Sequence, residues 1–319
     1  MPLEPVSREF VDAYLASGEL PVQESSPGIA RLGEIVMAGV SGPGPEVGSV
    51  ENRKIAGPAG DFRIRVLKPY GRSDAIVVYF HGGGWVIGDI DLQYDNVGRQ
   101  LANLSHATVV LVNYHKAPEH PFPTALRDSY AALEWVADHA AELAPLGVPL
   151  VVAGDSAGGN IAAVMTQWAR DRLGPKIDLQ VLVYPVTDCD FTRASFLAKE
   201  NQLLLTSDAM KWFWRQYLPD EAAREHPDAS PLRAQSHAGL PPALVYVAEY
   251  DPLHDEGVAY AEALEAAGVR VALEEATGEM HTFIQMANVL PGCDRGLAVV
   301  ADFIKQSIPH VAQEGVHHA

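Results

Sequence analysis

Short apolar runs alternate with amphipathic stretches over most of the chain. Six runs are rich in Val, Ile, Leu and aromatic residues, and several are apolar almost throughout, which is typical of strands buried on both faces. They span 75–80, 107–113, 149–154, 179–185, 242–249 and 269–276. Stretches that favour helix lie between them, at 94–105, 124–143, 157–172, 255–267 and 293–307. Alternating strands and helices predict right-handed crossovers and a mostly parallel, doubly wound α/β sheet.

Three segments depart from this rhythm. Residues 50–56 and 61–68 flank the turn GPAGD and predict a hairpin. The first 48 residues predict one or two helices and then a loop rich in Gly and Pro. More than fifty residues between 185 and 242 show no clear strand but contain many large apolar and aromatic side chains. An insertion of that length in an α/β domain is usually a functional lid, so we interpret it as a helical cap, joined by the N-terminal helices.

The composition excludes several classes of protein. The 319 residues are 48% hydrophobic and 20% charged, the balance of an ordinary globular protein rather than a disordered one. The net charge is −18, which repels phosphate backbones and anionic lipid surfaces. No apolar run approaches the about 18–20 residues that span a bilayer. We therefore expect no nucleic-acid partner and no stable association with a membrane.

The cysteines predict neither a disulfide framework nor a metal site. Cys189 and Cys293 are the two in the chain, and no CxxC or Cys/His spacing suggests zinc, so we expect free thiols and no metal. The N-terminus MPLEPVSREF carries acidic residues and no apolar core, unlike a signal peptide. Together these features predict a cytoplasmic protein.

A candidate nucleophile lies where an apolar strand runs directly into a helix. Residues 154–158 read GDSAG, which is the G-x-S-x-G pattern in its strand–turn–helix context. Small residues two before and two after Ser156 let strand and helix approach closely, so the hydroxyl stands exposed at a helix N-terminus. Asp155 is adjacent to Ser156, and adjacent side chains on a sharp turn point apart. Asp155 is therefore not the acid partner of the serine, and we interpret it as a support or substrate-binding residue.

A run of glycines offers backbone donors for the oxygen of a tetrahedral intermediate. HGGGW at 81–85 directly follows the strand at 75–80, and glycines allow the backbone to approach a substrate with no Cβ in the way. We assign the donors of an oxyanion hole to Gly83, Gly84 and Ala157, and an anchoring role to His81. A phosphate-binding loop would end in Gly-Lys-Ser/Thr, and a dinucleotide fingerprint would open a helix; neither pattern is met here.

The base and the acid are expected on loops after late strands. Where a nucleophilic serine lies on a strand–turn–helix elbow, the usual chain order is Ser, then Asp or Glu, then His. Asp251 follows the strand at 242–249, and His281 follows the strand at 269–276 with an aromatic residue nearby. Asp255 and Glu256 are the alternative acids, but they lie within the next helix and more simply cap it. We predict a triad of Ser156, His281 and Asp251, which needs no metal and no cofactor.

Four motifs in order resemble the hormone-sensitive-lipase-like (family IV) esterases of the α/β-hydrolase superfamily: HGGGW at 81–85, NYHKAPEHPFP at 113–123, GDSAGG at 154–159 and DPLHDE at 251–256. The resemblance covers roughly residues 50–310. It implies an α/β-hydrolase fold, with a mostly parallel sheet of about eight strands, helices on both faces and a helical cap. The catalytic domain is expected at 49–187 and 238–319, and the cap at 1–48 and 188–237. The family often dimerises through its last strand and helix, here near 269–307.

Three positions depart from the commonest pattern of that family. His254 stands where the family usually has Arg, Thr282 where it has Gly, and His115-Lys116 where it has Arg-Leu. None of these changes removes a group of the predicted triad. Thr282 is expected to narrow the approach to His281, and His254 to alter a salt bridge near Asp251.

The resulting hypothesis is a serine carboxylesterase that hydrolyses small-molecule esters with short-to-medium acyl groups, through an acyl-enzyme on Ser156. Trp85, Leu205 and Phe213 are the candidate apolar substrate contacts, with Asp155 as a polar one. Two alternatives stay open. An amidase or deacetylase could use the same triad, and a non-catalytic ligand-binding homologue could keep the pocket, although such proteins lose a triad residue.

Overall fold

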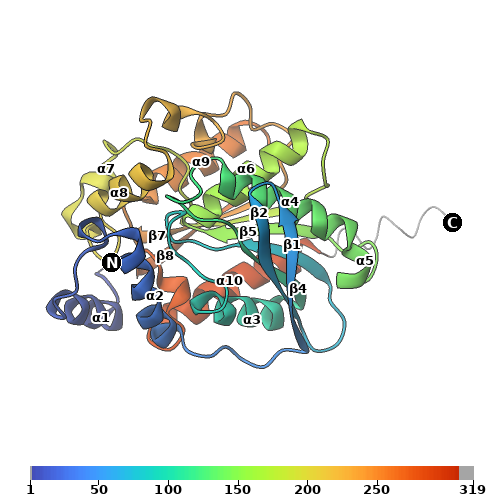
Figure 1. Cartoon of the computed structure of the whole chain (residues 1–319), viewed down its shortest axis with the longest axis horizontal. Helices are drawn as coiled ribbons and strands as arrows, with labels where there is room; N and C mark the ends of the chain where they lie inside the picture. The colour runs from blue at the N-terminus through green and yellow to red at the C-terminus, as the bar shows by residue number, and fades with distance from the viewer. Residues whose placement is uncertain (1, 309–319) are drawn as a thin grey trace.

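An eight-stranded sheet runs through the centre of the molecule (Figure 1). The computed structural model describes residues 2–308. The strand order is β1-β2-β4-β3-β5-β6-β7-β8, with antiparallel pairing of β1 with β2 and of β2 with β4 and parallel pairing elsewhere. The strands are β1 Ser49–Gly57, β2 Gly60–Lys68, β3 Ala75–Phe80, β4 Ala107–Asn113, β5 Leu150–Asp155, β6 Leu179–Val183, β7 Ala243–Tyr250 and β8 Val271–Met280. The predicted mostly parallel α/β sheet is confirmed.

The burial of each strand follows its place in the sheet. Every residue of β3 and β6 is buried, because helices cover both faces of the central parallel strands. Most residues of β1 are exposed, and β1 is an antiparallel edge strand with one partner. This difference explains why the central strands read as continuous apolar runs in the sequence, whereas the hairpin does not.

Helices cover both faces of the sheet (Figure 1). On one face α3 packs against α10, and on the other α4 packs against α6, with α9 against β7. The bounds are α3 Gln93–Ser105, α4 Thr124–Asp138, α5 Ala140–Leu143, α6 Ala157–Asp171, α9 His254–Ala266 and α10 Pro291–Ser307. The single helix expected over 124–143 is interrupted at His139, whose Nδ1 lies 2.8 Å from the carbonyl oxygen of Trp135 and whose ring stacks on the Trp135 ring.

The N-terminal segment and the insertion are helical. The N-terminal elements are α1 Pro5–Ala16, the 3₁₀ helix η1 Val22–Glu24 and α2 Pro27–Ser41. The insertion contains α7 Ala194–Leu197, η2 Lys199–Asn201, α8 Ser207–Tyr217, η3 Ala222–Glu225 and η4 Pro231–Arg233. Side-chain caps begin two of these helices, since Ser26 Oγ accepts the N–H of Ile29 and Thr206 Oγ1 accepts that of Ala209.

The two helical segments lie at the same end of the molecule, where η1 contacts α8 (Figure 1). Their separation from the sheet as a cap domain stays a prediction, and the last residues of the predicted catalytic domain, 309–319, lie outside the described part of the chain. Within residues 2–308, no helix has the length and apolar character needed to cross a membrane.

Candidate active site

Three polar side chains meet at the carboxyl edge of the sheet. Ser156 directly follows β5, Asp251 follows β7 and His281 follows β8, and the carboxyl ends of parallel strands share one edge. His281 Nε2 lies 3.0 Å from Ser156 Oγ, and His281 Nδ1 lies 2.6 Å from Asp251 Oδ2. A carboxylate that accepts the Nδ1 proton leaves the lone pair of Nε2 directed at the serine hydroxyl. The structure thus joins the three residues of the predicted triad in one hydrogen-bonded chain.

The acid and the serine are fixed by their own backbone neighbours. The other carboxylate oxygen of Asp251 accepts the N–H of Leu253 at 2.8 Å. The carbonyl oxygen of Asp251 accepts a hydrogen bond from Asn201 Nδ2 at 3.2 Å, which ties this loop to the insertion. Ser156 N–H donates to the carbonyl oxygen of Val183 at 2.9 Å. The three side chains are therefore held before any substrate arrives.

The turn at residues 154–158, the elbow, is strained and closely packed. Ser156 has φ 55° and ψ −120°, a conformation that non-glycine residues rarely adopt. A Cβ on Gly158 would lie 1.9 Å from the carbonyl oxygen of Phe80, and one on Gly154 would lie 2.3 Å from that of Gly158. Only glycine fits at these two positions, which is the physical basis of the motif that identified Ser156.

Residues 81–88, the glycine loop, lie beside the elbow. The loop follows β3, which pairs with β5 so that Phe80 is opposite Gly154. Gly83 and Gly84 have φ of 104° and 56°. Within residues 2–308, the backbone N–H groups of Gly83, Gly84 and Ala157 donate to no protein acceptor. These three N–H groups are therefore unpaired in the described part of the chain, as the predicted oxyanion hole requires.

His81 anchors the start of this loop. Its ring stacks on Tyr114, with centroids 4.2 Å apart and planes 11° apart, and Tyr114 Oη donates to its carbonyl oxygen. His81 Nδ1 lies 2.7 Å from the carbonyl oxygen of Gly82. Burial lowers the pKa of His81 well below its ordinary value, so the ring is neutral. It acts here through packing and hydrogen bonding rather than through charge.

Asp155 lies beneath the elbow, at the centre of a buried network. Its carboxylate accepts hydrogen bonds from Tyr79 Oη, Tyr94 Oη and Gln285 Nε2 at 2.8–3.0 Å, and from Gly82 N at 3.1 Å. Burial raises the pKa of Asp155, while the hydrogen bonds from the two tyrosines oppose that rise. The side chain has no exposed surface. Of the two roles that the sequence allowed, the structure fits the support role and argues against contact with substrate.

The candidate apolar contacts divide into two groups. Trp85 has no exposed surface, because its ring stacks on Tyr217 at 4.1 Å and meets Trp214 edge-on at 5.0 Å. A side chain with no accessible surface cannot contact a substrate, so the expectation for Trp85 is corrected to a packing role. Phe213 lies directly against the glycine loop, where a Cβ on Gly84 would be 2.2 Å from its ring. Leu205 is also nearly buried and keeps a little exposed surface, as Phe213 does.

The comparisons with known proteins agree with this geometry. Residues 77–285 match the family described as alpha/beta hydrolase fold. The chain is 43% identical over 249 residues to the carboxylesterase NlhH of Mycobacterium tuberculosis, covering 75% of this chain and 78% of that protein. It is 38% identical over 235 residues to an ethyl acetate hydrolase of Pseudomonas putida, covering 73% and 74%. A hyperthermophilic esterase from the archaeon Pyrobaculum calidifontis superposes with a TM-score of 0.89 at 38% identity, covering 96% and 99%.

The chain belongs to the α/β-hydrolase fold family. The resemblance to the hormone-sensitive-lipase-like esterases within this superfamily is confirmed. The α/β-hydrolase sheet, its elbow and its carboxyl-edge loops were predictable because they follow local patterns. The hydrogen-bond partners of Asp155 were missed, since no motif marks Tyr79, Tyr94 or Gln285.

The three departures from the family pattern have structural counterparts in this α/β-hydrolase. Thr282 has φ 72°, in the left-handed region where glycine is favoured, which explains the usual residue there. His254 contacts Glu275 at 3.2 Å and Asp255 at 3.1 Å. His115 Nδ1 lies 2.6 Å from Asp128, and the amino group of Lys116 donates to Asn113, with burial lowering the pKa of Lys116 to about 8.

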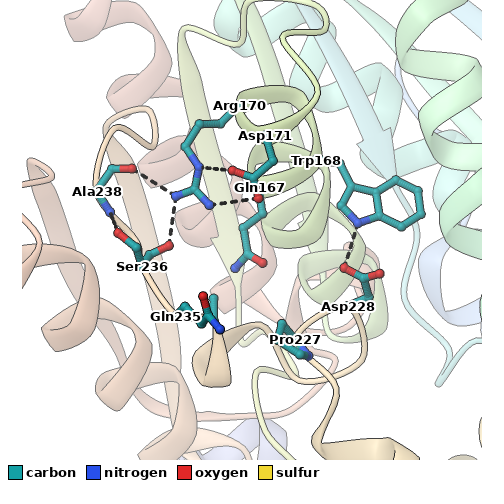
Figure 2. Close-up of a pocket in the computed structure, with 10 residues that line it drawn as sticks. Gln167, Trp168, Arg170, Asp171, Pro227, Asp228, Gln235, Ser236 and Ala238 are labelled. Carbon is teal, nitrogen blue, oxygen red and sulfur yellow. Dashed lines mark hydrogen bonds and ion pairs between the residues drawn. The ribbon is translucent and has the colours of Figure 1, made fainter.

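A cavity of about 460 Å³ lies elsewhere on the α/β-hydrolase body, between α6 and the end of the insertion (Figure 2). Trp168 Nε1 donates to Asp228 at 2.7 Å, and Arg170 Nη1 donates to the carbonyl oxygens of Ser236 and Ala238. These hydrogen bonds hold residues 227–238 against α6. No residue of the predicted triad lines this cavity. Within residues 2–308, no cluster of three or more His, Cys, Asp or Glu side chains is arranged to hold a metal ion.

Proposed function

We propose that the protein is a serine carboxylesterase that hydrolyses small esters through an acyl-enzyme on Ser156. The observation that carries this proposal is the continuous hydrogen-bonded chain from Asp251 through His281 to Ser156, formed by three loops at one edge of the sheet. The relatives named carboxylesterase and ethyl acetate hydrolase support the same reaction.

The reaction has two acyl-transfer steps. His281 Nε2 takes the proton of Ser156 Oγ as that oxygen attacks the ester carbonyl carbon, and the N–H groups of Gly83, Gly84 and Ala157 stabilise the resulting oxyanion. Collapse of the tetrahedral intermediate breaks the ester C–O bond, and His281 gives its proton to the departing alcohol. Water then attacks the acyl-serine with His281 as the base again, releasing the acid and restoring the serine. The carboxylate of Asp251 accepts the hydrogen bond from the Nδ1–H of His281 throughout.

Substitution of the triad tests this function directly. We expect Ser156→Ala to lower the turnover of p-nitrophenyl acetate by about 10⁴-fold or more, and Asp251→Asn by about 10³–10⁴-fold, because the asparagine permits the wrong tautomer of His281. Both variants should keep the circular dichroism spectrum of the wild type. A folded Ser156→Ala variant with wild-type turnover would end the proposal.

The substrate class is proposed as esters with short-to-medium acyl groups. Ser156 and His281 are only 6% and 3% exposed, and Phe213 packs against the glycine loop, so the space for an acyl chain is restricted. A series of p-nitrophenyl esters from acetate to palmitate tests this point, and maximal kcat/KM on the longest chains would overturn it. Faster cleavage of matched anilides than of esters would instead favour the amidase or deacetylase alternative. A folded wild type that binds these esters without turnover would favour the non-catalytic ligand-binding alternative.

Three features of organisation belong to the same proposal. We infer a catalytic domain at 49–187 and 238–319 and a cap at 1–48 and 188–237, supported by the contact of η1 with α8. We infer a cytoplasmic location, because Cys189 and Cys293 are free thiols. A homodimer through the region 269–307 is supported by the position of β8 at the edge of the sheet, and sedimentation of the full chain tests it.

A further inference from the structure

Helix α2 buries a charged side chain against the protein while it exposes several apolar ones. Glu34 is 6% exposed, whereas Leu32 and Ile35 are each 64% exposed. A surface helix ordinarily buries its apolar stripe and exposes its charges. The inner side of α2 combines apolar contacts with polar ones, and the polar ones are made above all by Arg31 and Glu34.

Glu34 holds the far end of the glycine loop. Its Oε1 accepts the N–H of Gly88 in a short hydrogen bond, and it also accepts Gln93 Nε2 at 3.1 Å. Gly88 has φ 103°, and a Cβ there would lie 2.2 Å from His81 Nδ1. Gly88 is thus confined between the anchoring histidine on one side and the carboxylate of α2 on the other.

Arg31, one turn earlier on the same helix, holds the middle of the loop. Its Nε donates to the carbonyl oxygen of Val86 at 2.9 Å, and its Nη2 donates to that of Ala117 at 2.8 Å. Ala117 N–H in turn donates to the carbonyl oxygen of Trp85 at 2.9 Å. The guanidinium also pairs with Glu119 through two hydrogen bonds. Val86 is therefore fastened both to α2 and, through its neighbour, to the segment after β4.

Hydrogen bonds within the glycine loop connect the residues held by α2 to the N–H groups of Gly83 and Gly84. The carbonyl oxygen of Gly83 accepts the N–H of Val86 at 3.0 Å and that of Ile87 at 2.9 Å, so residues 83–87 form one hydrogen-bonded turn. A turn closed in this way moves as a unit. We therefore expect a displacement of Val86, within this turn, or of Gly88, directly after it, to shift the backbone N–H groups of Gly83 and Gly84.

We propose that Arg31 and Glu34 are positioning residues for the oxyanion hole, which hold the N–H groups of Gly83 and Gly84 in place from an N-terminal helix. This inference rests on the proposed esterase function. Both residues act through the backbone of the glycine loop, and their hydrogen bonds are made to Val86 and Gly88 rather than to the reacting groups.

Loss of the hydrogen bonds of Arg31 or Glu34 should destabilise the transition state more than it weakens substrate binding. Loss of one oxyanion-hole donor costs about 10²–10³-fold in kcat, and a displaced donor costs part of that. We expect Glu34→Ala and Arg31→Ala to lower kcat for p-nitrophenyl acetate by about tenfold or more, with KM changed less than about threefold. A trifluoromethyl ketone, which forms a tetrahedral adduct on the serine, should lose affinity in parallel with kcat/KM.

Two further variants separate positioning from general damage to the fold. Glu34→Gln keeps an oxygen that can accept the N–H of Gly88, so it should restore most of the kcat lost in Glu34→Ala. Leu32→Ala changes an exposed side chain on the outer face of the same helix and should match the wild type. Titration of Ser156 with a fluorophosphonate counts the active sites that can react. Dividing the rate by this count gives a kcat that is corrected for any unfolded fraction.

The outcomes distinguish this inference from the function on which it rests. A wild type that hydrolyses esters, together with Glu34→Ala and Arg31→Ala variants that match Leu32→Ala in kcat and in ketone affinity, overturns the inference alone. The inference is also overturned if KM rises by as large a factor as kcat falls and Glu34→Gln restores neither value. That result would indicate a general structural role for the two residues. A wild type that hydrolyses no ester overturns the proposed function and the inference with it.

Discussion

Gln285 Nε2 donates a hydrogen bond to the carboxylate of Asp155 at 2.8 Å, although the two residues are 130 positions apart. Asp155 precedes the nucleophile, and Gln285 lies four residues after His281, so this contact joins the elbow to the loop that carries the base. The same carboxylate accepts the N–H of Gly82, at the start of the glycine loop. One buried acid thus connects the three parts of the site whose relative positions matter for catalysis.

Asp155→Asn should damage both stability and activity. The amide replaces one acceptor oxygen with a donor, which then faces either the donors of Tyr79 and Gly82 or those of Tyr94 and Gln285. We expect a loss of about 2–4 kcal/mol in the free energy of unfolding, measured with urea, because buried donors lose their acceptor. The kcat/KM should fall by tenfold or more. Gln285→Ala removes one donor and should cost about 1 kcal/mol. Wild-type values for Asp155→Asn would contradict the role of this network.

Gly84→Ala should reduce activity through a specific clash. The added Cβ would lie 2.2 Å from the ring of Phe213, and the φ of 56° is itself unfavourable for alanine. Because the glycine loop must shift to relieve the contact, we expect kcat/KM to fall by about 10²-fold. Phe213→Ala in the Gly84→Ala background removes the clash and should recover part of that loss. The single Phe213→Ala variant is the control, and an additive double variant would refute the clash.

The sequence predicted what depends on local pattern. Strands 75–80 and 107–113 coincide with β3 and β4, because strands covered on both faces are apolar at nearly every position. Ser156, Asp251 and His281 were found because each follows a strand in a fixed chain order. The structure brings their side chains within hydrogen-bond distance of one another.

The parts that sequence reasoning missed depend on distant partners. Trp85 was assigned to the substrate because an aromatic residue beside the glycines suits either a pocket or the core. Its burial is decided by Tyr217, which is 132 positions away and whose ring stacks on it. The charged residues Arg31 and Glu34 look like ordinary surface residues of an N-terminal helix. Only the fold brings the glycine loop against them.

Thr282→Gly should stabilise the protein. Thr282 follows His281 with φ 72° and ψ 0°, where a β-branched residue is strained, and its buried hydroxyl has no hydrogen-bond partner within residues 2–308. Glycine relieves both costs but loses more entropy on folding, so we expect a net gain of about 1 kcal/mol in urea unfolding. The kcat should stay within about threefold of the wild type, since the hydrogen bonds of His281 are unchanged. A loss of stability would show that the threonine is not strained.

Glu256 is a buried acid outside the triad. It has no exposed surface, and its Oε1 accepts the N–H groups of Thr187 at 2.7 Å and Asp188 at 3.3 Å. Its Oε2 has no hydrogen-bond partner in the described part of the chain. Burial raises the pKa of Glu256 well above its ordinary value, against the opposing effect of the two backbone hydrogen bonds. The folded protein therefore keeps this carboxyl protonated at pH values where the unfolded chain has already ionised it.

The contribution of Glu256 to the free energy of unfolding should consequently fall as pH rises above the ordinary pKa of a glutamic acid. In that range the folded state binds more protons at Glu256 than the unfolded state, so unfolding becomes easier with each step in pH until the raised pKa is passed. Glu256→Gln keeps the oxygen that accepts from Thr187 and cannot ionise. We expect the variant to match the wild type near pH 4 and to become increasingly more stable than the wild type as the pH rises toward 8, measured by urea unfolding. Leu146→Ala, at an apolar side chain that is 83% exposed, is a control that should not change the slope. A stability difference between Glu256→Gln and the wild type that is independent of pH would mean that Glu256 is ionised in the folded protein, and that its charge is held by the two backbone donors.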